Sequence, residues 1–189
     1  MLTNGVLDYI AITSHDSIQA AQRIQQELGD HIIVGEEITT QDGEIIGLYL
    51  TQEIPSGLTV QQAVAAIKEQ HGLVYIPHPF ETKRKGLQDS ALRRIAPNVD
   101  IVEGYNGRAV FQNHSQKATT WASTYHKPIA ASSDAHGWYG WGRTYSVLPQ
   151  PPTCQTLSTL LGQATYKTHN PGIRGLLYPK INRLRHRNV

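Results

Sequence analysis

Histidine and carboxylate side chains follow short apolar runs at four separate places in the chain. The residues are His15, Glu37, His78 and the pair Asp134 and His136. Runs of this kind are typical of strands buried in a parallel sheet, and parallel strands present their carboxyl ends at one edge. Nitrogen and oxygen donors in this number suit Zn, Mn or Fe. We therefore predict that these five residues are ligands of a metal site that can hold more than one ion, although Asp134 could instead cap the next segment and His136 could be a surface histidine.

The elements expected to position these residues alternate between strands and helices. An Asp-Gly turn at Asp42 and Gly43 indicates a hairpin, and Thr59 with Gln62 forms a capping box. This alternation predicts an α/β fold. Strands are expected over 6–13, 31–37, 44–50, 73–76, 100–105, 129–136 and 145–148, with helices over 18–28, 59–72, 90–95, 118–125 and 156–161.

Composition limits the classes of protein that the chain can belong to. The 189 residues, 39% hydrophobic, are enough for one domain, which we divide into a barrel over 1–148 and a C-terminal helix and basic tail over 149–189 packing on it. The net charge of +2 lies largely in that tail, so it does not by itself indicate binding of nucleic acid.

The single Cys154 excludes an intrachain disulfide, and no apolar run approaches ~18 residues. We expect a cytoplasmic protein without a membrane segment.

Three further side chains are candidates for contact with substrate. Arg143 has the planar, permanently charged fork that binds two phosphate oxygens, although a structural capping role is equally compatible with its position. Arg84, in the basic loop 83–85, is a second phosphate contact, and Asn106 follows the strand that carries Glu103. We predict Asp134, His136 and Arg143 as catalytic residues and Arg143, Arg84 and Asn106 as substrate-binding residues.

The ordered motifs resemble a known superfamily. SHDS at 14–17, GEEIT at 35–39, PHP at 77–79 and SDAH at 133–136 resemble successive metal motifs of the PHP (polymerase and histidinol phosphatase) domain superfamily, in its free-standing form. The resemblance implies a distorted (β/α)7 barrel and two or more divalent transition metal ions. It also implies hydrolysis of phosphoesters by a metal-bound hydroxide. Substrates would be a small phosphate monoester, a nucleotide or an oligonucleotide 5′ end, the last through 5′-3′ exonuclease activity.

Three departures from the superfamily pattern lead to alternative hypotheses. The sequence has no His-x-His motif, Ser14 replaces the usual first carboxylate, and Asn106 stands where the pattern often has histidine. We therefore expect the barrel to lack its first strand, and the chain to be a truncated start of a longer hydrolase, with weak metal binding and little activity alone. The alternatives are a metal-poor PHP-like binding protein, which metal content would reveal, and a metal amidohydrolase, which turnover of amides would reveal.

Overall fold

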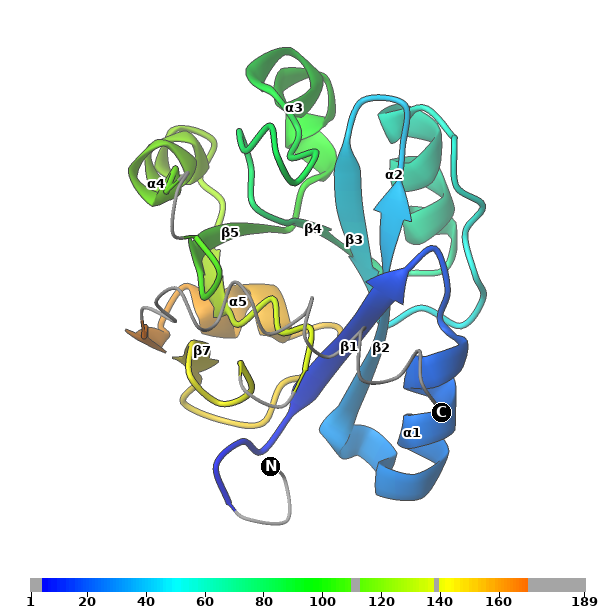
Figure 1. Cartoon of the computed structure of the whole chain (residues 1–189), viewed down its shortest axis with the longest axis vertical. Helices are drawn as coiled ribbons and strands as arrows, with labels where there is room; N and C mark the ends of the chain where they lie inside the picture. The colour runs from blue at the N-terminus through cyan, green and yellow to red at the C-terminus, as the bar shows by residue number, and fades with distance from the viewer. Residues whose placement is uncertain (1–4, 110–112, 138–139, 170–189) are drawn as a thin grey trace, which may run out of the picture.

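A single curled sheet of six strands forms the framework of the protein (Figure 1). The structure is a computed structural model that describes residues 5–109, 113–137 and 140–169. Within the sheet each strand pairs with the strand that precedes or follows it in the chain. The order is β1 (Ile10–His15), β2 (Ile32–Thr39), β3 (Glu44–Leu48), β4 (Leu73–Ile76), β5 (Ile101–Asn106) and β6 (Ile129–Ser132).

Strand β3 runs against the direction of the other five. It pairs antiparallel with β2 and β4, whereas the β1–β2, β4–β5 and β5–β6 pairs are parallel. The predicted hairpin is therefore confirmed, with Thr39 opposite Glu44 at its closed end. Because of the reversal, β3 begins at the edge where its neighbours end.

Four helices cover the convex face of the sheet (Figure 1). A larger apolar cluster lies between them and the alternate strand residues Val34, Ile38, Ile45, Val74 and Ile76. The capping box of Thr59 and Gln62 is present at the start of α2, as predicted. These helices are α1 (Gln19–Leu28), α2 (Val60–Glu69), α3 (Asp89–Ile95) and α4 (Ser115–Thr124).

A smaller apolar cluster covers part of the concave face. It joins Ile46, Tyr75 and Ile101 of the sheet to Leu157 and Leu161 of α5 (Leu157–Leu161). Beside it, β7 (Tyr145–Val147) pairs antiparallel with β8 (Thr165–Lys167), a strand that sequence patterns did not predict. The remainder of the concave face is free to carry polar side chains.

The structure confirms a mixed α/β architecture with a half-barrel sheet of six strands. The predicted first strand begins four residues later than expected and extends to His15. Closure into a seven-stranded barrel, and the division of the chain at residue 148, stay predictions. Most of the basic tail lies outside the described residues. No helix in the described part of the chain is long and apolar enough to cross a membrane.

Candidate metal centre

The alternation of side chains along the strands decides which polar residues face the concave side. On β2, Val34 and Ile38 belong to the cluster under the helices, and Ile33 belongs to the concave cluster. Successive side chains of a strand point to opposite faces, so Glu37 shares the concave face with Ile33. Glu36 faces the helices instead, where it is completely buried.

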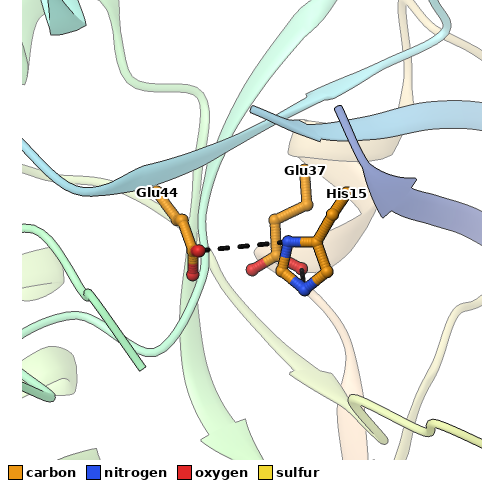
Figure 2. Close-up of side chains that lie close together, drawn as sticks. All are labelled: His15, Glu37 and Glu44. Atoms are coloured by element: carbon orange, nitrogen blue, oxygen red, sulfur yellow. Dashed lines mark ion pairs between the residues drawn. The ribbon is translucent and has the colours of Figure 1, made fainter. Parts of the chain in front are cut away.

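Three side chains from the first three strands meet at the edge of this concave face (Figure 2). His15 Nε2 lies 3.6 Å from Glu37 Oε2, and His15 Nδ1 lies 3.9 Å from Glu44 Oε1. Each residue offers one ligand atom, and the three atoms all lie within 4.8 Å of one another. Ligands about 2 Å from a shared transition metal ion lie up to about 4 Å apart, so a small inward movement would complete the coordination.

His78, from the loop after β4, joins the same group. Its Nε2 lies 3.0 Å from Glu37 Oε1 and 3.9 Å from Glu44 Oε2. Burial lowers the pKa of His78, but the hydrogen bond to Glu37 and the charge of Glu103 outweigh burial and raise that pKa above its ordinary value. Its Nδ1 is buried without a hydrogen-bond partner among the described residues. His15, Glu37, Glu44 and His78 are called the four-residue cluster below.

Glu44 is a member of the cluster that sequence reasoning missed. It was expected only as the start of a strand, and a start normally lies at the opposite edge from the carboxyl ends of parallel strands. The reversed direction of β3 brings it opposite Thr39, two residues from Glu37. The hairpin signal, followed through to its register, could have found it.

The two carboxylates of the cluster favour a cation between them. Burial and the nearby charge of Glu37 raise the pKa of Glu44, and the histidines His15 and His78 only partly offset this. Two acidic groups forced together out of water repel each other, and a bound divalent ion removes that repulsion. The donor set of two imidazoles and two carboxylates fits Zn, Mn or Fe.

Asp134 and His136 form a second group with different partners. Asp134 Oδ2 accepts hydrogen bonds from Arg84 and, at 3.2 Å, from Asn106 Nδ2. Arg108 Nη1 lies 3.3 Å from Asp134 Oδ1 and 2.9 Å from His136 Nδ1. Burial raises the pKa of Asp134, but the charges of Arg84 and Arg108 outweigh burial and lower that pKa below its ordinary range. Arg108 was not predicted as a site residue.

Glu103 forms hydrogen bonds with residues of both groups. Its buried carboxylate accepts hydrogen bonds from the backbone N–H of His78 at 2.6 Å, from Asn106 Nδ2 at 2.8 Å and from the Ser132 hydroxyl. Burial raises the pKa of Glu103. By holding both His78 and Asn106, this carboxylate fixes the spacing between the two groups.

Three of the eight described non-glycine residues with positive φ lie in or next to the site. Asp16, His78 and Asp134 have φ values of 49°, 28° and 46°, in the region that residues with a side chain seldom adopt. Each of them follows directly on or close behind the end of a strand. Strained positions of this kind cluster at functional sites, where the surrounding structure holds them in place.

The structure thus brings three of the five predicted ligands together and places the other two beside them. His15, Glu37 and His78 surround Glu44, and the rings of His15 and His136 lie 6.3 Å apart, centroid to centroid. Arg143 is partly buried just before β7. The ligand, catalytic and substrate-binding roles assigned from the sequence stay predictions.

Comparison with known proteins gives relatives whose names assign no function. No family model matches the chain. It is 34% identical over 110 residues to the uncharacterized protein MJ1587 of Methanocaldococcus jannaschii and 38% identical over 117 residues to the uncharacterized protein MJ0417 of the same organism. The matches cover 57% and 60% of this chain. They span only 64% and 49% of those two relatives.

Solved structures share the fold at low sequence identity. A two-domain Bacteroides vulgatus protein, described as containing a "predicted PHP-like metal-dependent phosphoesterase", matches with a TM-score of 0.66 at 16% identity, over 86% of this chain and 56% of its own. PsfC of Pseudomonas syringae gives 0.69 at 15% identity, over 97% and 86%. A candidate metal-dependent phosphoesterase of Bifidobacterium adolescentis gives 0.56 at 15%, over 72% and 80%. The chain therefore has a PHP-like fold.

Proposed function

We propose that the chain is a metal-dependent phosphoesterase of the PHP superfamily. The observation that carries the proposal is the convergence of the four-residue cluster on the concave face, from three strands and one loop. The PHP-like fold supports it, because one protein that shares this fold is described as containing a predicted PHP-like metal-dependent phosphoesterase and another as a candidate metal-dependent phosphoesterase.

The residues of the cluster would hold the ion and set its position. His15 and His78 supply imidazole nitrogens, and Glu37 and Glu44 supply carboxylate oxygens. A divalent ion bound there supplies positive charge for phosphoryl oxygens and lowers the pKa of a bound water. Asp134 and His136 complete the predicted ligand set on one side of the cluster, where Arg84 competes with any ion for the Asp134 carboxylate.

We assign the binding of the anionic part of the substrate to arginine side chains. Arg143 keeps its proposed role as a two-point phosphate contact, and Arg108, beside the partly exposed His136, is a second donor on the same side as Asp134. The proposed substrates are a phosphorylated small molecule, a nucleotide or an oligonucleotide 5′ end. A cytoplasmic location also stays a proposal, supported by the single cysteine.

Metal binding and turnover test the proposal together. The purified chain is stripped of metal with a chelator and titrated calorimetrically with Zn²⁺ and with Mn²⁺. The loaded protein is then assayed against a generic phosphate monoester and a short 5′-phosphorylated oligonucleotide. Loss of an outer partner of a ligand already weakens metal binding about 10–100-fold. Glu37→Gln and Glu44→Gln, which remove ligands, should therefore weaken it at least about tenfold. Glu69→Gln, at an exposed position of α2, is the matched control.

Two results would separate the alternatives. Binding of no stoichiometric ion would favour a metal-poor binding protein. An ion that binds through the cluster, with hydrolysis of amides but not of phosphoesters, would favour an amidohydrolase. If the Glu44→Gln and Glu69→Gln variants bind the metal ion with equal affinity, Glu44 is not a ligand of the site.

A further inference from the structure

All three nitrogens of the Arg84 guanidinium donate hydrogen bonds to other side chains of the protein. Nε and Nη2 donate to the two carboxylate oxygens of Glu81 at 2.8 and 2.6 Å. Nη1 donates to Asn106 Oδ1 at 2.8 Å and to Asp134 Oδ2. The side chain is 18% exposed, and those of Glu81 and Asp134 are 7% and 12% exposed. One largely enclosed cation is therefore shared by two carboxylates, of which Asp134 has Arg108 as a second partner.

The loop that carries Arg84 is held against the sheet by its own backbone. Phe80 N donates to Leu87 O at 3.0 Å, Gly86 N donates to Glu81 O at 2.7 Å, and Glu44 N donates to Lys85 O at 2.9 Å. Gly86 packs so closely that a Cβ built on it would overlap the His78 carbonyl. The guanidinium is consequently held in place before any ligand arrives.

The carboxylates of the two neighbouring groups have different kinds of partner. Glu37 and Glu44 pair with His15 and His78, and Glu44 also lies 3.9 Å from the exposed Lys85 ammonium. An imidazole nitrogen can itself become a ligand of a metal ion. Asp134 pairs with two arginines, which keep their protons at any relevant pH and cannot coordinate a metal.

We propose that Arg84 is a built-in cation that occupies a metal ion's place at Asp134, so that the chain binds one divalent ion at the four-residue cluster rather than two or three. The inference rests on the proposed metal-dependent function. It assigns Arg84 a role as a positioning residue that fixes Asp134 and Asn106, instead of a direct contact with substrate phosphate. An ion at Asp134 would have to expel a guanidinium that Glu81 also holds.

Counting bound ions tests the inference without any assay of turnover. The full chain is dialysed against Mn²⁺ or Zn²⁺ and the ions per chain are measured by elemental analysis, with calorimetry as a second count. We expect one ion for the wild type and still one for Asp134→Asn. Arg84→Met removes the cation that Glu81 and Asp134 share and leaves Asp134 with Arg108 alone, so we expect two ions per chain. The second ion should be lost again in the double variant Arg84→Met/Asp134→Asn.

A control variant and a second measurement support the interpretation of the ion count. Arg93→Met removes an arginine that pairs with Asp89 on the exposed side of α3 and should leave the count at one. The Arg84→Met variant should also gain more in thermal stability from added Mn²⁺ than the wild type does, because the ion replaces its missing charge. If Arg84→Met does not fold, the Asp134→Asn count still decides, since it needs only the wild-type loop.

The inference is overturned if the wild type binds two ions and Asp134→Asn loses one, or if folded Arg84→Met still binds one. Its failure can be told from failure of the proposed function. Two ions with phosphoester turnover would refute only the inference, whereas one ion without phosphoester turnover would refute only the function. A wild-type chain that binds no ion would refute both.

Discussion

Replacement of Glu36 by glutamine should change how the stability of the protein depends on pH. Glu36 is completely buried under the helices, with Oε2 accepting the Ile54 N–H at 2.9 Å and Oε1 lacking a partner among the described residues. Burial, only partly offset by the Ile54 hydrogen bond, raises the pKa of Glu36 from 4.5 to about 6. The folded protein therefore holds this proton more tightly than the unfolded chain. The contribution of this proton to the free energy of unfolding is fully present below the unfolded pKa of 4.5, and it is lost as the pH rises through about 6. Its full size is about 2 kcal/mol.

The assay is urea unfolding of the wild type and Glu36→Gln at pH 7.5 and pH 4.5. The neutral amide has its own packing cost, but that cost does not vary with pH. The difference in unfolding free energy between variant and wild type should therefore move by about 1.5 kcal/mol in favour of the variant on going from pH 4.5 to pH 7.5. Glu69→Gln, on the exposed side of α2, is the control for general charge effects. A difference that stays constant between the two pH values, to within about 0.3 kcal/mol, would refute the assignment of a proton to buried Glu36.

Two further substitutions test the local structure that supports the site. Gly86→Ala should destabilise the protein by about 1–3 kcal/mol, measured by urea unfolding, because its Cβ would overlap the His78 carbonyl; an unchanged midpoint would show that the loop can move away. Thr59→Ala should cost about 1 kcal/mol in the same measurement, because the Thr59 side chain accepts the Gln62 N–H at the start of α2, and Thr59→Ser should restore most of that loss.

Sequence patterns predicted the features that depend on position along the chain. His15, Glu37 and His78 each follow an apolar run that predicts a strand, and the structure places both histidines against Glu37. The hairpin and the capping box are also predictable from the sequence, because turn and cap residues act on backbone only a few positions away.

Features that depend on contacts across the fold could not be predicted in this way. Glu44 reaches the site only because β3 is reversed, and Arg108 meets Asp134 because each lies two residues beyond the paired ends of β5 and β6, Asn106 and Ser132. The pairing of Arg84 with Asp134 joins residues 50 positions apart through a loop folded onto the sheet. Spacing in the sequence carries no information about which buried charges will neutralise each other.

The order of strands in the sheet has a consequence for how the protein can form during synthesis. Each strand of the six-stranded sheet after β1 pairs with the strand made immediately before it, so the sheet can grow at one edge while the rest of the chain is still being translated. No strand has to insert between two that are already paired. Three members of the four-residue cluster, His15, Glu37 and Glu44, belong to the first three strands made. The metal side of the centre can therefore begin to assemble before the arginine-bound Asp134 has left the ribosome.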